Sequence, residues 1–337
     1  MAPSYSGVWN ISTQYQYRSG WPIDTNILPV GSMAVFFLGS NPRQNDPIEF
    51  VNISSASNSV DFGDCSQHHQ APNGAASSST RLLIAGNNET TPGDRKNISY
   101  ITFATKGNGQ DFGDLSSDGR SSVSSGSGNG RGIFAGGANS GRIDIIDYVT
   151  ISSTGNATDF GNLSTANQGL SSCGSTTRLC MGGGSPSGSV YANEIQYITI
   201  SSTGNTTDFG DLTLARSNLA AASSSTRGVF AMGFHGGTGA VGNNIDYITI
   251  ASTGNATDFG DSTQSRYLAG GASNSTKAIF AGGFAYGNDA GGTAINDTVN
   301  TIESITIAST GNAIDHGDLS IATNSAGGGS DSHGGIA

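Results

Sequence analysis

Short apolar clusters recur along the chain at a nearly constant spacing, with polar, glycine-rich segments between them. Six segments rich in β-branched and aromatic residues end in Asp-Phe-Gly or a close variant, and their starts are 50, 48, 49, 50 and 57 residues apart. A period near 50 residues is that of one four-stranded blade of a β-propeller. The six segments begin at Ile48, Ile98, Ile146, Ile195, Ile245 and Ile302.

Each repeat predicts four strands, named A to D from the innermost to the outermost. In one repeat, Leu219–Ser223 predicts strand A, Arg227–Met232 strand B, Ile245–Ile250 strand C, and the segment around Asp258 strand D. Strand A carries small residues because the blades converge on one axis, while the outer strands are bulky on both faces because each blade lies between two neighbours. The Ser/Thr-rich A–B turns and the Thr-Gly-Asn C–D turns are typical of hairpins.

The two ends of the chain predict how the ring closes. The tail from Asp331 resembles the start of a strand B, with His333 where Arg227 stands in its repeat, and the chain then stops. The segments from Val8 and from Gln14 resemble a strand C and a strand D. We therefore expect an all-β, seven-bladed propeller over residues 1–337, with the last blade closed by N-terminal strands pairing with C-terminal strands. An open solenoid would leave the N-terminal strands unpaired.

Composition agrees with strands and turns and limits the partners. The chain has 51 glycines, and only 12% of its residues are charged. Its formal charge is −11 with 14 Lys and Arg, so we expect no nucleic-acid partner. The N-terminus has no signal-peptide pattern and no segment has the length of a membrane span, which predicts a chain made in the cytoplasm without membrane insertion.

The order of small strand A, then RGIFAGG, a variable loop, IDYVTI and TDFGN resembles the kelch repeat, in which a Gly-Gly pair ends strand B. Phenylalanine, or His316 in one repeat, stands where kelch blades usually carry tryptophan. Two further features resemble virion-associated proteins of tailed phages of marine and cyanobacterial hosts. They are the repeat sequences STGNTTDFGDLT and SSSTRGVFAMG and the N-terminal sequence MAPSYSGVWNISTQYQ. This second resemblance implies a propeller carried on a virus particle.

The sequence gives little sign of a metal site, a disulfide or a cofactor. Cys65, Cys173 and Cys180 form no CxxC pair, although Cys173 and Cys180 flank a predicted turn and could face each other. His68 and His69 would point to opposite sides of a strand, and His316 is most simply a packing residue. We expect no metal and no cofactor.

Repeated charges predict structural ion pairs. The Asp-Phe-Gly segments carry an aspartate, and most strand-B blocks begin with a cation. A ring of oxygen ligands for Ca²⁺ is one interpretation of the aspartates. We favour ion pairs with strand-B cations of the same or an adjacent blade, with Gly-Asp forming the turn after strand D. The residues in question are Arg81, Arg131, Arg178, Arg227 and Lys277 with Asp111, Asp159, Asp208 and Asp258.

The variable loops predict a binding face. Strands alternate in direction, so the uniform A–B and C–D turns share one face of the disc and the diverse B–C and D–A loops share the other. Divergence within an internal repeat marks either relaxed constraint or function. Aromatics beside Asn and Asp are typical of sugar recognition, which makes the following residues candidates for ligand binding: Tyr191, Phe234, His235, Phe284 and Tyr286.

The leading functional hypothesis is a non-enzymatic, virion-associated propeller. It would act in a tail or fibre as an adhesion module for a host surface glycan or for another particle protein. A decoration or connector subunit with a purely structural role is the second hypothesis. An enzyme acting on polysaccharide is the third, and we do not favour it, because the chain has four glutamates in all and no sialidase-like arrangement.

Overall fold

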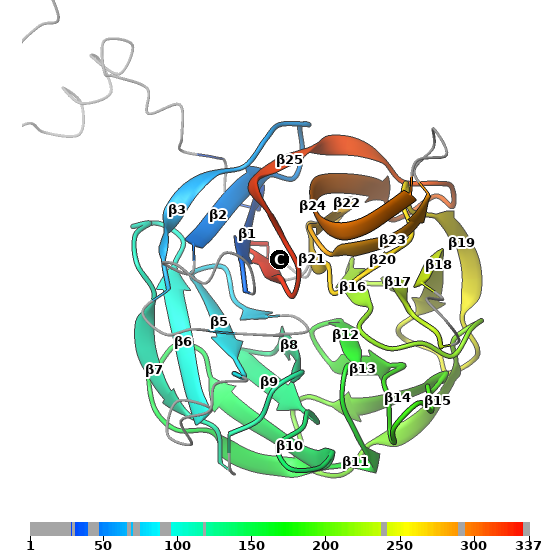
Figure 1. Cartoon of the computed structure of the whole chain (residues 1–337). Helices are drawn as coiled ribbons and strands as arrows, with labels where there is room; N and C mark the ends of the chain where they lie inside the picture. The colour runs from blue at the N-terminus through cyan, green and yellow to red at the C-terminus, as the bar shows by residue number, and fades with distance from the viewer. Residues whose placement is uncertain are drawn as a thin grey trace, which may run out of the picture.

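The structure, a computed structural model, describes residue 28, residues 31–39, 47–65, 69, 75–87, 96–116, 119–236, 241–288 and 294–332. These residues form six antiparallel sheets around a central axis, a six-bladed β-propeller (Figure 1). The described part of the chain contains no helix that is long and apolar enough to cross a membrane.

Blades 1 to 3 come from the two ends and the first half of the chain. The strands of each blade are named in the order A to D. Blade 1 is β26 (Gly327–Ser330), β1 (Met33–Phe37), β2 (Pro47–Asn52) and β3 (Val60–Asp64). Blade 2 is β4 (Ala76–Ser77), β5 (Arg81–Ala85), β6 (Asn97–Thr102) and β7 (Gln110–Asp114). Blade 3 is β8 (Ser124–Gly128), β9 (Arg131–Ala135), β10 (Ile143–Thr150) and β11 (Thr158–Asn167).

Blades 4 to 6 follow in chain order, and blade 6 has two additional strands on its loop side, β20 (Arg266–Tyr267) and β23 (Phe284–Asn288). Blade 4 is β12 (Ser171–Gly174), β13 (Arg178–Gly182), β14 (Glu194–Thr199) and β15 (Thr207–Asp211). Blade 5 is β16 (Ala220–Ser223), β17 (Arg227–Phe234), β18 (Val241–Thr249) and β19 (Thr257–Asp261). Blade 6 is β21 (Gly270–Ser273), β22 (Lys277–Ala281), β24 (Ala294–Thr306) and β25 (Ile314–Thr323).

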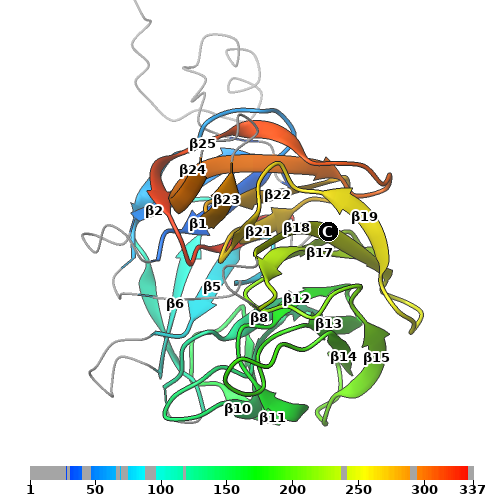
Figure 2. The ribbon, with the colours of Figure 1, turned by 45° about the vertical axis from the view of Figure 1, so that its right-hand side comes forward.

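The predicted number of seven blades is wrong. The glycine-rich segment Gly327–Ser330 is strand A of the blade whose strand B begins at Met33, with Ala34 opposite Ser330 and Phe37 opposite Gly327. The tail therefore completes the first blade rather than starting a seventh. The predicted strands from Val8 and Gln14, and His333, lie outside the described residues. In both views the C-terminal strands lie beside blade 1 (Figures 1 and 2).

The innermost strands carry small residues because adjacent blades approach each other closely near the axis. A methyl group on Gly126 would lie 2.5 Å from Cδ1 of Leu179 in the next blade, and one on Gly128 would lie 2.5 Å from Cδ1 of Ile200. The A strands surround an axial cavity of about 60 Å³ lined mainly by Ser, Ala and Gly. The prediction of small residues at the axis is confirmed.

The hydrophobic core consists of six clusters, and each fills the space between two adjacent blades. The cluster between blades 6 and 1, for example, brings Ile279 and Ile302 of blade 6 against Phe36 and Val51 of blade 1, all nearly inaccessible to solvent. Because no blade has a core of its own, the stability of each blade depends on its two neighbours.

A second contact joins the blades at the rim. The C–D turn of each blade packs against strand D of the preceding blade. Between blades 2 and 3, the Gly155 amide donates to the Phe112 carbonyl (2.8 Å), and Asn156 Oδ1 accepts from the Asp114 amide (3.1 Å). Between blades 6 and 1, Asn58 Oδ1 accepts from the Asp318 amide (3.1 Å). The repeated Thr-Gly-Asn and Asp-Phe-Gly motifs are thus the two halves of one contact.

Substitution of the glycine in the Asp-Phe-Gly motif tests this rim contact. Gly113 has φ +144°, and a methyl group there would lie 2.5 Å from the Gly155 carbonyl oxygen, whereas Gly155 itself (φ +155°) has open space around it. Gly113→Ala should therefore lower the urea midpoint clearly more than Gly155→Ala, which adds only backbone strain of about 1–3 kcal/mol. Equal losses for the two variants would show that the close approach is not a constraint.

Deletions at the two ends test which strand closes the ring. Removal of residues 325–337 takes away β26, exposes β1 as a sheet edge, and should lower the melting temperature and promote aggregation. Removal of residues 1–20 leaves all four strands of blade 1 and should change the melting temperature little. Thermal unfolding and light scattering measure both effects, and the reverse pattern would contradict this closure.

Candidate functional site

A row of aromatic side chains crosses the loop face over blades 4, 5 and 6. Tyr191 and Phe234 have ring centroids 5.5 Å apart, Phe234 and Tyr267 5.6 Å, and Tyr267 and Phe284 5.7 Å. Neighbouring rings are inclined by 51° to 62°; Tyr191 meets Phe234 edge to face, and the other two pairs are tilted. Side chains from three blades thus form one continuous surface, called the aromatic row below.

The end of the row on blade 6 is a small sheet of its own. β23 pairs with β20 on one side and with β24 on the other, which places Tyr267, Phe284 and Thr298 in line across three strands. Tyr286 stands opposite Asn296 in the same sheet. Since alternate residues of a strand share a face, Phe284 and Tyr286 point the same way. Tyr286 is 41% exposed, the most open of these aromatic rings.

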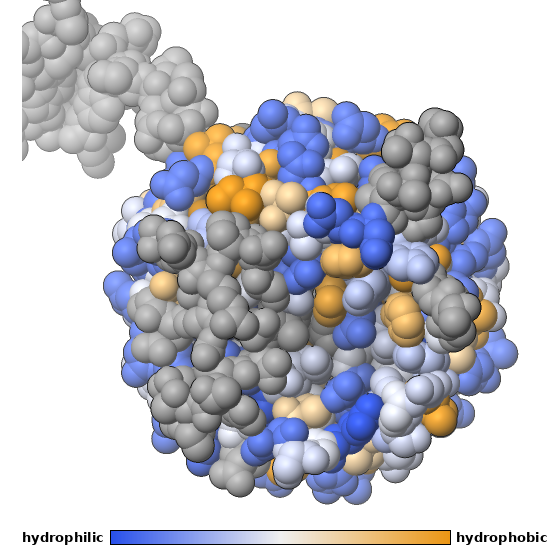
Figure 3. Space-filling model, viewed as in Figure 1, coloured by the Kyte–Doolittle hydropathy of each residue, from blue (hydrophilic) through white to orange (hydrophobic). Residues whose placement is uncertain are grey.

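The structure brings together three of the five residues predicted to bind ligand, namely Tyr191, Phe234 and Phe284. Tyr286 extends the row on β23, while His235 follows Phe234 and lies half-buried beside Gly242. Figure 3 shows this face as a mosaic of hydrophilic and hydrophobic residues. The four residues of the row are each partly exposed to solvent on this mixed face.

Tyr267 was missed by the sequence analysis. It lies in a D–A loop, whereas most of the predicted candidates lie in B–C loops. Burial raises the pKa of the Tyr267 phenol above the usual value for tyrosine. The available signal was an aromatic residue in a variable D–A loop, on the face predicted to bind a ligand.

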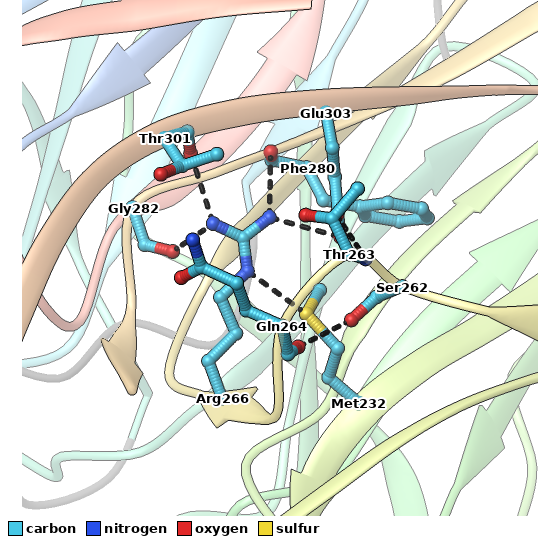
Figure 4. Close-up of polar contacts among 9 residues, drawn as sticks. All are labelled: Met232, Ser262, Thr263, Gln264, Arg266, Phe280, Gly282, Thr301 and Glu303. Atoms are coloured by element: carbon cyan, nitrogen blue, oxygen red, sulfur yellow. Dashed lines mark hydrogen bonds and ion pairs between the residues drawn. The ribbon is translucent and has the colours of Figure 1, made fainter. Parts of the chain in front are cut away.

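Buried arginines hold the loops that carry the row. The Arg266 guanidinium donates to the carbonyl oxygens of Gly282 (3.0 Å) and Thr301 (2.9 Å) and pairs with Glu303 (2.9 Å), as Figure 4 shows. It also lies 3.1 Å from the Met232 sulfur. The side chains of Arg266 and Glu303 are fully buried. The pair fixes the backbone of β20 and hence Tyr267.

Arg216 has the same role for the middle of the row. Its guanidinium pairs with Asp246 (3.1 Å), both side chains being fully buried. Its backbone amide donates to the Ala192 carbonyl (3.1 Å), next to Tyr191, and the following residue, Ser217, exchanges two backbone hydrogen bonds of 2.8 Å with Phe234. Burial lowers the pKa of the Arg216 guanidinium and the Asp246 carboxylate opposes this shift. One ion pair therefore positions two rings of the row.

Equivalent positions in the other blades hold different polar pairs. Blade 3 has a third fully buried ion pair, Arg120 with Asp147 at 2.9 Å. In blade 2, His69 lies 2.9 Å from the Ser99 hydroxyl. These pairs were not predicted. Arg216 and Arg266 each stand five residues after an Asp-Phe-Gly-Asp motif, but nothing in the sequence marks them as buried.

The cations that begin strand B make a different contact from the predicted one. The guanidinium of Arg81, Arg131, Arg178 or Arg227 lies over a tyrosine of its own blade, 4.2 to 4.7 Å from the ring centroid. Each also donates to a backbone carbonyl of the next blade, as Arg131 does to Ile200 (2.8 Å). Lys277 donates to the Ser54 carbonyl (3.2 Å). Among the described residues, the ion pairs found are those of Arg120, Arg216 and Arg266.

The predicted aspartate partners lie apart from these cations, on the outer strands. Asp111 accepts a hydrogen bond from the Asn97 side chain (2.8 Å). Asp111, Asp159, Asp208 and Asp258 are all exposed at the start of strand D. Among the described residues, no group of three or more His, Cys, Asp or Glu side chains could hold a metal ion.

The cysteines and His316 are packing residues in the structure. Cys173 and Cys180 stand directly opposite each other on β12 and β13, both are buried free thiols, and both belong to the core between blades 4 and 5. Burial raises the pKa of Cys180 to about 12 and that of Cys173 well above its usual value. His316 is buried and its Nε2 lies 2.8 Å from the Asn52 carbonyl of blade 1.

The six-sheet ring identifies the chain as a β-propeller of repeated blades. Neither a protein-family model nor a curated protein matches the sequence.

Substitution of Arg216 tests its role as an anchor. Arg216→Met leaves the Asp246 carboxylate buried without its partner and should lower the free energy of unfolding by about 3–5 kcal/mol. The double variant Arg216→Met/Asp246→Leu should recover most of this loss, because no buried charge remains. Arg227→Met, at a partly buried cation over Tyr247, is the matched control and should cost about 1 kcal/mol. Urea denaturation measures all three, and equal losses for Arg216→Met and Arg227→Met would contradict the assignment.

Proposed function

We propose that this chain is a non-enzymatic, virion-associated β-propeller that binds a glycan of a host surface through the aromatic row. The observation that carries the proposal is the contiguity of the row. Four rings from the loops of three blades lie within 5.7 Å of their neighbours, although the loops differ in length and sequence. Aromatic faces are suited to the apolar C–H faces of sugar rings, and amide side chains such as Asn296 are suited to their hydroxyl groups.

The construction of the surface also supports binding. The buried pairs of Arg216 and Arg266 hold the backbone beside the rings, so a ligand would meet side chains that are already in place. Little conformational entropy is then lost on association. The acidic balance of the chain, with a formal charge of −11, favours a neutral sugar over an anionic one.

The assignment to a virus particle is supported by the resemblance of the STGN and DFGD repeats, and of the first 16 residues, to virion-associated proteins of tailed phages. The kelch-like order of the strand motifs is part of the same proposal. The particle would present the disc with its loop face toward the host and another particle protein would hold it elsewhere. The chain would then be found in the virion, in a tail or fibre.

Binding to a glycan array, followed by titration with the best neutral oligosaccharide, tests the proposal. Tyr286→Ala and Phe284→Ala should weaken binding about ten-fold or more, since buried aromatic anchors dominate such surfaces. Val60→Ala on the rim is the matched control, because Val60 is 45% exposed and Tyr286 41%. The control should bind as the parent does.

Two outcomes would reject the glycan proposal. Absence of binding across the array, with symmetric copies of the protein visible on purified particles, would favour the purely structural decoration or connector role. Turnover of a bound polysaccharide would show an enzyme instead.

A further inference from the structure

The junction between blades 6 and 1, which closes the ring, has a titratable side chain where the other blades have a hydrocarbon ring. The residue before the glycine of strand D is phenylalanine in blades 1 to 5 and His316 in blade 6. All six residues are between 2% and 4% exposed, so the histidine is as deeply buried as the phenylalanines. The five phenylalanines are Phe62, Phe112, Phe160, Phe209 and Phe259.

His316 joins the two blades by a hydrogen bond for which the neutral imidazole is sufficient. Its Nε2 lies 2.8 Å from the backbone carbonyl of Asn52, at the end of β2. A carbonyl oxygen can only accept, so Nε2 carries the hydrogen and Nδ1 keeps its lone pair in the neutral ring. A second proton, on Nδ1, would place a positive charge in a buried side chain, which is costly.

Lys277 contacts the same segment of blade 1 as the histidine. Its Nζ donates to the Ser54 carbonyl (3.2 Å), two residues after Asn52. Burial lowers the pKa of His316 below its usual value of 6.5, and the Lys277 ammonium lowers it further. The hydrogen bond to Asn52 and the Asp315 carboxylate oppose this shift without cancelling it. The site therefore favours the neutral ring.

The other ionisable side chains of the strands beside the histidine are already partnered or exposed. Glu303 of β24 is held in its buried ion pair, and Asp318 of β25 is exposed. Glu49 of β2 is buried and accepts a hydrogen bond from the Ser320 amide (3.1 Å). The turn of blade 1 that follows β2, residues 53–58, contains no ionisable side chain.

We propose that mild acid loosens the junction between blades 6 and 1, with His316 as the sensor. Histidine is the side chain that ordinarily changes its charge between pH 5 and 8. Protonation would leave a positive ring buried near Lys277, whereas the phenylalanines of the other five blades have nothing to protonate. The inference concerns the closure of the disc and does not depend on glycan binding.

The direction of the effect follows from the lowered pKa of His316. The open junction binds the proton near pH 6.5 and the closed junction only at lower pH, so closure is most stable above about pH 6.5 and weakens as the pH falls. At pH 5.5 the ratio of closed to open forms can fall by up to about ten-fold. Asp331 acts in the opposite direction, because burial raises its pKa and the closed form binds that proton more readily.

Hydrogen exchange of the full chain at pH 7.5 and 5.5, followed by mass spectrometry, tests the sensor. After correction for the intrinsic exchange rate, protection of residues 53–60 should fall about three- to ten-fold at pH 5.5. This segment includes the Ser59 amide, which donates to the Asp318 carbonyl across the junction (2.9 Å). Residues 151–163, at the junction of blades 2 and 3, are the internal reference and should keep their protection.

Three variants connect the response to the histidine. His316→Phe restores the residue of the other five blades and should remove the loss at pH 5.5. His69→Asn is the matched control, because His69 is also buried (3% exposed) but lies beside Ser99 in blade 2, and it should leave the response of residues 53–60 unchanged. Lys277→Gln removes the like charge and should reduce the response about two-fold.

An NMR titration of the His316 ring in the parent chain gives a measurement that needs no variant, and the ring should titrate below pH 6.5. A pKa of 6.5 or higher would overturn the inference. An equal loss of protection at the junction of blades 2 and 3 would overturn it too, since acid would then act on the whole disc. So would a folded His316→Phe variant that responds to acid as the parent does.

Discussion

The pairing of β26 with β1 is the contact on which the rest of the structure depends. β26 is Gly-Gly-Gly-Ser and has no large side chain to bury, so it acts through its backbone hydrogen bonds to residues 34–37. The Asp331 carboxylate extends this contact, because it accepts hydrogen bonds from the amides of Gly31 and Met33, both at 2.9 Å. Once this sheet forms, blade 6 faces blade 1 and the sixth core cluster can be buried.

Closure also explains why a surface assembled from three blades can keep one geometry. Every blade is held on two sides by a core cluster and by the rim contact, so a single blade cannot tilt without disturbing its neighbours. The aromatic row adds a local level of order, since the buried ion pairs of Arg216 and Arg266 fix the D–A loops next to the rings. A binding surface on loops needs such support, because loops are otherwise the least constrained part of a propeller.

The class of fold, the four-stranded repeat and three residues of the aromatic row were predicted from the sequence, because these features follow from its repeated pattern. The sequence shows six repeats, and the seventh blade was wrongly added from the two ends of the chain. A strand A made of Gly327–Ser330 has no hydrophobic pattern, and the tail from Asp331 imitates the start of strand B by chance. The contacts of the strand-B cations could not be predicted from the sequence either. A repeat shows which residues recur, but it does not show which residues of a neighbouring blade they contact. Buried arginines were hidden for the opposite reason: among the described residues they are found in blades 3, 5 and 6 and do not recur in every blade.

The six blades are similar in sequence, so the contacts that most of them share show what the fold requires. Blade 6 departs from its copies at four positions of the rim, and closure accounts for two of them. His316 contacts the Asn52 carbonyl of blade 1, and Lys277 contacts the Ser54 carbonyl. Closure does not account for Ser304, which removes a ring from the side of its own blade, or for Ile314, which is 65% exposed. The C–D turns of blades 3 and 6 form hollows of similar volume, about 200 and 210 Å³, so the hollow does not depend on the missing ring. Blade 1 also carries an exposed aliphatic residue, Val60, at the position of Ile314, so the fold itself tolerates such a residue there.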